Sequence, residues 1–391
     1  MTCVPDAVQR AIVRLAPYFH TFRRGALLIR DRHKHRISGD PGSAAHHFVL
    51  RYARDTASAF ALLVVSIAAM PALANDTSAE LATGGLIFVR NENVEMRSED
   101  LTISAKEVSV RYRFFNTSDK PVTVLVAFPM PEIRIDEPDQ NIALPTEDPV
   151  NFLAFTTTVN GAPVKMEVEQ RVTAAGIDRT QLLRTLGVPL APHLQATGDA
   201  LDRLPKDKWD DLLRIGLAEI EEYDAGKGLE RHLAPRWALA TTFYWEQTFA
   251  AKAETVVEHR YQPSVGMSVQ TSLGAPDAAT EPWFDEYKQK YCLDKDFLAA
   301  LDRARRASRS QFGAPYSEQR IDYVLRTGAN WSGAIQNFRL VVDKGDADSL
   351  VSFCAEGIRR INATQVEVRK NDFTPEGDLS VLILKKLPPQ P

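Results

Sequence analysis

Residues 107–128 read EVSVRYRFFNTSDKPVTVLVAF, and this stretch decides the expected fold class. From Glu107 to Phe115 polar and apolar residues alternate, which is the two-residue period of a strand with one buried face. Residues 116–121 have turn-forming side chains, and Val122–Phe128 is apolar on both faces, as in a more deeply buried strand. Two strands joined by a short polar loop predict an antiparallel hairpin.

Other parts of the chain repeat this pattern. A second hairpin is expected from Phe152–Val159 and Val164–Val172, since the Asn160-Gly161 pair between them is a strong turn signal. Further strands are expected at residues 237–249, 254–261, 319–327, 335–342, 350–353, 365–369 and 379–385. Many short strands separated by turns favour a β-sandwich over a parallel sheet.

Helical periodicity interrupts the strands twice. A short helix is expected after Asp178 and a longer one at residues 206–223, where apolar residues recur at helical spacing. Another amphipathic helix follows Asp294. We therefore expect a mainly β protein, all-β with an α insertion, built as two β-sandwich-like domains. The expected organisation is a first β domain at 75–270 with a helical insertion at 176–230, a linker at 271–282, and a helix followed by the second β domain at 283–391.

An export signal is expected at residues 49–74. Two arginines precede an uncharged, largely apolar run, and small residues stand where signal peptidase reads the chain. These are the features of a secretory signal peptide, and they predict cleavage between Ala74 and Asn75 and a periplasmic or secreted product. An uncleaved membrane anchor is the alternative, although the run is short for a bilayer span. No other membrane contact is expected.

Residues 1–48 do not fit such a signal, and we expect them to be a non-native or disordered extension. A start codon placed too far upstream would explain them, with Val49 or Leu50 as the true initiator. A metal-binding histidine tract is one alternative, because five of the eight histidines lie here. A twin-arginine signal at Arg23-Arg24 is another, but the apolar run begins more than thirty residues later.

Charge is divided unevenly along the chain. Residues 1–74 contain ten Lys or Arg and four Asp or Glu, a net of +6, whereas residues 75–391 contain 37 and 47, a net of −10. Non-specific binding to nucleic acid needs clustered cations. An acidic body of this kind excludes nucleic acid as the expected partner.

The cysteines fit an exported protein. Cys3 lies in the part expected to be removed, which leaves Cys292 and Cys354 to form one disulfide in an oxidising compartment. The alternative is two buried free thiols. The sequence has no CxxC motif, so neither a thioredoxin-like nor a zinc-ribbon protein is indicated.

The sequence also lacks the common catalytic motifs. It has no P-loop, no GxSxG elbow, no HExxH and no dinucleotide-binding glycine pattern. The histidines beyond residue 75, which are His193, His232 and His259, are too far apart in sequence to indicate a metal site. We therefore expect no cofactor, no metal and a non-catalytic binding or envelope-interaction module, whose partner is a periplasmic protein or a glycan.

One pair of segments offers a catalytic alternative. If residues 245–247 and 258–261 lie on paired strands, a periplasmic hydrolase acting on glycan or peptide could use Glu246, Glu258 and His259. The same segments supply the ligand-binding candidates Trp245, Arg260 and Tyr261. The structural alternative is a cross-strand ionic ladder above an aromatic core.

A further ligand candidate is Trp331. It lies in the glycine-flanked stretch Thr327-Gly328-Ala329-Asn330-Trp331-Ser332-Gly333. A tryptophan in such a loop can form a flat platform for a ligand. The alternative is an anchor that closes the end of the sandwich.

Several stretches resemble a domain-of-unknown-function family of secreted Gram-negative proteins. The matching stretches are residues 80–86, 96–101, 112–118, 128–131, 259–263 and 327–333. The likeness covers about residues 75–390 and implies a periplasmic protein, without an activity, ligand or catalytic residue to carry over. The first β region is also similar to the vault protein inter-alpha-trypsin domain, which implies shared β architecture only.

Overall fold

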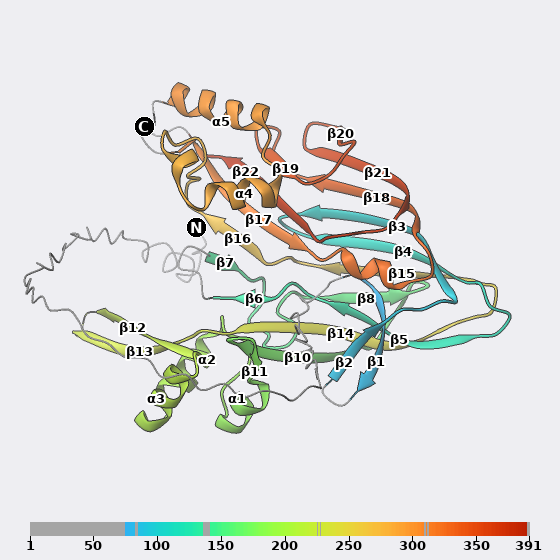
Figure 1. Ribbon diagram of the computed structural model, residues 1–391, viewed down its shortest axis with the longest axis horizontal. Coiled ribbons are helices and arrows are strands. Elements are labelled where there is room, and N and C mark those ends of the chain that lie inside the picture. Colours follow the sequence, from blue (N-terminus) through green and yellow to red (C-terminus); the bar gives the residue numbers. More distant parts are fainter. Residues whose placement is uncertain are drawn as a thin grey trace, which may run out of the picture. The chain divides into compact units, whose positions relative to one another are not determined.

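The computed structural model describes residues 75–388, apart from 83–84, 136–140, 225, 227, 309 and 311–312 (Figure 1). The expected extension and signal peptide, with Ala74 at its end, lie outside the described residues. The fold is mainly β with a helical insertion, as predicted. Within the described part, no helix is long and apolar enough to span a bilayer.

The first sheet has seven antiparallel strands in the order β11-β10-β14-β5-β1-β2, with β6 also paired to β14. Its strands are β1 (Thr77–Ala82), β2 (Gly85–Val89), β5 (Val122–Pro129), β6 (Ile133–Arg134), β10 (Glu167–Ala174), β11 (Ile177–Asp178) and β14 (Ala238–Phe249).

The second sheet has eight strands in the order β20-β21-β18-β3-β4-β15-β8-β9. Its strands are β3 (Val94–Ser104), β4 (Val108–Asn116), β8 (Thr156–Val159), β9 (Ala162–Pro163), β15 (Glu254–Tyr261), β18 (Ile335–Asp343), β20 (Arg359–Arg360) and β21 (Gln365–Phe373). Strand β18 runs parallel to β3, while the other neighbours are antiparallel.

Two smaller sheets complete the strands. The five-stranded sheet has the order β19-β22-β17-β16-β7, and β12 pairs only with β13. Their strands are β7 (Asn141–Ala143), β12 (Ala218–Asp224), β13 (Leu229–Pro235), β16 (Val265–Ser268), β17 (Tyr316–Tyr323), β19 (Leu350–Phe353) and β22 (Leu379–Lys386).

Strands from both expected β domains share sheets. Strands β18, β20 and β21 come after the expected linker at 271–282, yet they extend the sheet that contains β3, β4 and β15. Figure 1 shows β18 and β21 beside β3 and β4. The described residues therefore form one compact unit rather than two separate sandwiches.

The first expected hairpin does not form, and the second forms only over the two residue pairs next to its turn. Strand β4 pairs with β3 and β15, whereas β5 pairs with β14 and β1, so the turn after Phe115 connects two sheets. Asn116 holds this connection, because its Nδ2 donates to the carbonyls of Lys120 and Phe249. At the Asn160-Gly161 turn, β8 forms a hairpin with the short β9 and pairs on its other side with β15, while β10 crosses to the seven-stranded sheet.

The insertion contains the helices α1 (Thr180–Leu186), α2 (Gln195–Asp202) and α3 (Lys206–Arg214). The helix expected at 206–223 ends early, because Gly216 adopts a positive φ of 71° and residues 218–224 form β12. Before the last strands lie α4 (Phe284–Tyr291), α5 (Lys295–Ser308) and the short 3₁₀ helices η1 (Ala278–Thr280) and η2 (Arg326–Asn330). Asp294 caps α5 as predicted, accepting from the Phe297 amide at 2.7 Å.

The main core lies between the inner faces of the two large sheets. Val110, Tyr112 and Phe114 point inward and are buried, while Arg111 and Arg113 point outward, as the alternation predicts. Aromatic rings fill the space: Phe155 lies 5.0 Å from the Phe128 ring centre and 4.6 Å from that of Phe243.

The predicted disulfide between Cys292 and Cys354 is present. It joins the end of α4 to the residue after β19, and the two cysteines are 62 positions apart in sequence. A cross-link across a loop of this length restricts the unfolded chain.

Replacing both cysteines with serine is expected to lower the free energy of unfolding by about 2–4 kcal/mol. Thermal unfolding followed by circular dichroism checks this, with the oxidised wild-type protein as reference. Reduced wild-type protein should unfold at the same temperature as the double variant. An unchanged midpoint in both would contradict a stabilising role for this bond.

Candidate functional site

The three residues of the hydrolase alternative lie on different surfaces. Glu246 is exposed on the outer face of the seven-stranded sheet, and His259 is buried in the core. Glu258 points outward from the eight-stranded sheet, where it pairs with Arg111 at 3.4 Å. The three side chains share no cleft, so the geometry gives no support to a hydrolase built on them.

The aromatic ligand candidates belong to the core. Trp245 is 4% exposed, Tyr261 is 3% exposed and Trp331 is fully buried, so none presents a ring to a ligand. Arg260 is exposed and pairs with Glu107 at 3.4 Å. This arrangement corresponds to the structural alternative, an ionic ladder above an aromatic core.

His259 instead belongs to a buried polar pair. Its Nε2 is hydrogen-bonded to Oδ1 of Asp76 at 2.8 Å, and both side chains are wholly inaccessible. Its Nδ1 lies 2.8 Å from the Thr157 hydroxyl, and the rings of Phe128 and Phe155 pack around it. Burial raises the pKa of Asp76, although the contact with His259 opposes this shift.

Asn75, next to Asp76, is held from several sides. Its backbone N–H donates to the Thr327 hydroxyl at 2.6 Å, and this hydroxyl donates back to the Asn75 carbonyl at 2.7 Å. Its side-chain Nδ2 donates to the Leu325 carbonyl and to Glu99 Oε2, both at 3.2 Å, and its Oδ1 accepts from the Tyr112 hydroxyl. Asn75 is thereby fixed within the core.

The loop 327–331 is built to receive this segment. A Cβ on Gly328 would lie 2.5 Å from Asn75 Nδ2, so a larger residue would push the asparagine away. The Trp331 indole donates to the Asp76 carbonyl at 2.7 Å, and Asn330 Nδ2 donates to the Thr77 hydroxyl at 2.8 Å. Trp331 is therefore an anchor for residues 75–77. We call residues 75–77, 327–331, Glu99, Tyr112 and His259 the amino-terminal cradle.

The cradle has more acceptors than donors. Oδ2 of Asp76 and Oε1 of Glu99 are buried and have no hydrogen-bond partner among the described residues. Burial raises the pKa of Glu99 to about 8, against the opposing effect of its hydrogen bond from Asn75. Asp76 thus has an imidazole as its partner, whereas Glu99 accepts only from the Asn75 side-chain amide among the described residues.

Sequence reasoning missed Asp76 and Glu99. A β-bulge between Met96 and Ser98 shifts the alternation, so that Glu99 points inward with Leu101 and Ile103. The period-two spacing of Glu99 with these two apolar residues is the signal that could have identified it. The residues next to Asp76 in sequence form no pattern that would predict the burial of its side chain.

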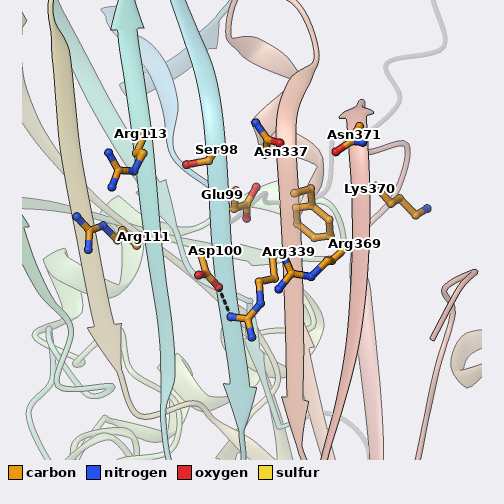
Figure 2. A pocket seen from close by; sticks show the side chains of 11 residues that line it. Ser98, Glu99, Asp100, Arg111, Arg113, Asn337, Arg339, Arg369, Lys370 and Asn371 are labelled. Carbon is orange, nitrogen blue, oxygen red and sulfur yellow. Dashed lines mark hydrogen bonds and ion pairs between the residues drawn. The ribbon is translucent and has the colours of Figure 1, made fainter. Parts of the chain in front are cut away.

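A second feature is a shallow groove of about 330 Å³ on the outer face of the eight-stranded sheet. Figure 2 shows its side chains in two rows across β4, β3, β18 and β21. One row has three uncharged polar residues and one arginine, and all four residues of the other row are charged. In strand order they are Arg113, Ser98, Asn337 and Asn371, and Arg111, Asp100, Arg339 and Arg369.

Most cations of this groove, which we call the charged groove, have carboxylate partners. Arg339 lies 2.7 Å from Glu367 and 2.9 Å from Asp100, and Arg369 lies 2.9 Å from Glu367. The two guanidinium groups lower the pKa of Glu367 to about 2. Ser98 and Asn371 make no side-chain hydrogen bond to any described residue, which leaves them open to a ligand.

Among the described residues, no cluster of three His, Cys, Asp or Glu side chains could hold a metal ion. The cradle therefore supplies a buried acid–imidazole pair, and the charged groove supplies an open, rigid set of hydrogen-bonding groups. Neither arrangement joins a nucleophile to a base in an accessible cleft.

A family described as a domain of unknown function, DUF4424, matches residues 74–382. The chain belongs to this family. Membership of a domain-of-unknown-function family, predicted from the sequence, is thereby confirmed. No curated protein matches the DUF4424 chain.

One solved structure that matches is from Legionella pneumophila and is described as a "putative nutrient binding protein". It is 18% identical in sequence, with a TM-score of 0.40, and the match covers 80% of this DUF4424 chain and 71% of the Legionella chain. Both features of the DUF4424 chain lie within the family match, which begins one residue before Asn75.

Proposed function

We propose that this chain is exported to the periplasm and acts there as a non-catalytic module that binds an acidic glycan. Export is supported by the agreement between two independent features. The sequence predicts cleavage after Ala74. Asn75, the next residue, is completely buried and hydrogen-bonded within the cradle, so the predicted new terminus would lie in a well-held part of the fold.

Cell fractionation followed by intact-mass measurement tests the export step. The expected product is a periplasmic protein whose first residue is Asn75. A full-length 43.6 kDa product in the cytosol would contradict export.

Binding is assigned to the charged groove, and the observation that carries it is the pair of rows across four strands. Neighbouring strands lie about 4.8 Å apart, so the rows offer regularly spaced hydrogen-bonding groups to an extended ligand. Four arginines in the two rows line the groove, each with a carboxylate partner, and Asp100 is the one outward-facing acid among the lining residues. Guanidinium groups pair with carboxylates in forked geometry.

The lining favours a glycan over a peptide. Phe338 is buried beneath the groove, so no apolar side chain opens into it as a pocket for a peptide residue. Amides and hydroxyls such as those of Asn337, Asn371 and Ser98 both donate and accept, which suits the hydroxyl groups of a sugar.

Asn337→Asp is expected to weaken binding of a homogalacturonan oligomer about tenfold, because it places a negative charge among the ligand carboxylates without changing the side-chain shape. Isothermal titration calorimetry at low salt is the measurement. Gln181→Glu, which adds the same charge on the exposed surface of α1, is the matched control and should leave binding unchanged.

The methyl-esterified oligomer should bind weakly to the wild-type protein, because it lacks the carboxylates. Added salt should weaken binding of the acidic form. Equal affinity of the wild-type protein for polyglutamate of the same charge would show that the groove selects charge rather than sugar. An equal loss of affinity for the oligomer in Asn337→Asp and Gln181→Glu would refute the assignment of binding to this groove.

A further inference from the structure

The cradle lacks a positive charge. Asp76 and Glu99 are both fully buried, and among the described residues the basic side chain that bonds to Asp76 is His259. The other titratable groups that face Glu99 are the hydroxyls of Tyr112 and Tyr323, which lie 3.1 Å apart. A buried carboxylate without a cation is costly, because burial penalises its charged form.

No nearby arginine supplies this charge. Arg326 precedes Thr327 in η2, but its guanidinium lies 3.7 Å from Asp378 and is occupied there. The remaining source of a small cationic group near Glu99 is the segment that already fills the cradle.

The backbone nitrogen of Asn75 is in the right place. It is buried, it lies 2.6 Å from the Thr327 hydroxyl, and the side-chain Nδ2 of the same residue touches Glu99 Oε2. As part of a peptide bond this nitrogen carries one hydrogen and no charge. As a free α-amino group it would be protonated near neutral pH and would have three N–H donors.

We propose that the cradle is a binding site for the chain's own α-ammonium group, with Glu99 as its counter-ion and Thr327 as a further acceptor. The inference rests on the proposed export, because the group forms only when water cleaves the bond between residues 74 and 75. That hydrolysis leaves a carboxylate on Ala74 and an amine on Asn75, which takes up a proton.

Several properties of the cradle fit an ammonium ligand. The unpartnered Oε1 of Glu99 offers an acceptor to a second N–H. The absent Cβ at Gly328 leaves room beside Asn75. Trp331 and Asn330 hold residues 76 and 77. These bonds position the first residue of the mature chain without any contribution from its α-ammonium charge.

The test compares four proteins expressed with their own leader and purified from the periplasm. They are the wild type, Glu99→Gln, a form with one serine inserted between Ala74 and Asn75, and the combination of the two changes. Intact mass identifies the first residue of each protein. The rate of acylation of the α-amino group by an N-hydroxysuccinimide ester is then followed against pH.

For the wild type we expect acylation at least about 100-fold slower than in an unstructured peptide, with a midpoint above the usual pH of about 8 for an α-amino group. Glu99→Gln should move the midpoint below 8, because a buried ammonium then has no counter-ion. The serine-extended forms should titrate normally with either residue at 99.

The same midpoint in wild type and Glu99→Gln would overturn the inference, since burial alone would then explain the slow reaction. Should Glu99→Gln fail to fold, the comparison of wild type with the serine-extended form decides, and equal midpoints overturn the inference. A first residue other than Asn75 would instead refute the proposed cleavage, and the ammonium site with it. The mass measurement thus separates the two failures.

Discussion

His259→Ala is expected to lower the free energy of unfolding by about 3–5 kcal/mol, or to prevent folding. The reason is that Asp76 would keep its buried position without its 2.8 Å partner, while a cavity would open between Phe128 and Phe155. Urea denaturation followed by tryptophan fluorescence measures the change.

His232→Ala is the matched control for this experiment. His232 on β13 also pairs at 2.6 Å with an aspartate, Asp202 at the end of α2, but both side chains are partly exposed. Water can solvate the aspartate left behind there, so we expect little change. Equal effects of the two substitutions would mean that burial of the Asp76–His259 pair has no special importance.

A second large effect is expected in the pH dependence of stability. In the serine-extended chain Asn75 carries no charge, and the pKa of Glu99 is about 8 in the folded state against 4.5 in the reference state. The folded protein therefore binds the proton more tightly than the unfolded chain. Stability contributed by this proton is fully present below pH 4.5 and is lost as the pH rises toward 8, by a few kcal/mol.

Comparison with Glu99→Gln in the same extended chain isolates this contribution, since other titrating groups such as Asp76 remain in both. Relative to the extended wild type, the variant should gain stability between pH 5 and pH 8, as measured by urea denaturation. A difference that is constant across this range would contradict the assignment to Glu99. In the mature protein the α-ammonium group should make the free energy of unfolding change less steeply with pH over this range.

The cradle and the groove are built on the same strand. Glu99 points into the core from β3, and its neighbours Ser98 and Asp100 point out into the charged groove. Successive residues of a strand face opposite sides, so one short stretch serves both features. The β-bulge after Met96 sets which residue faces which side.

Much of the local structure could be predicted from the sequence. The alternation at 107–115 identified the inward and outward faces of β4, and residues 254–261 and 350–353 match β15 and β19. These predictions succeed because a strand's faces depend on neighbouring residues only. The capping of α5 by Asp294 is predictable for the same reason.

Pairing between strands was harder to predict. The polar turn at 116–121 looks the same whether the chain returns beside β4 or crosses to the other sheet. What separates the two outcomes is the partner available to β5, which is β14, more than a hundred residues away in sequence. The expected hairpin failed at this point.

By itself, the sequence determined the strand faces, the mainly β class and the pairing of its cysteines, since these depend on local periodicity and on which residues are present. Only the tertiary structure decided the parallel contact of β18 with β3 and the placement of Asn75 against Thr327, which is 252 residues away. The physical reason is that burial of a polar group is tolerated only where distant parts of the chain supply its partners, and no local pattern records them.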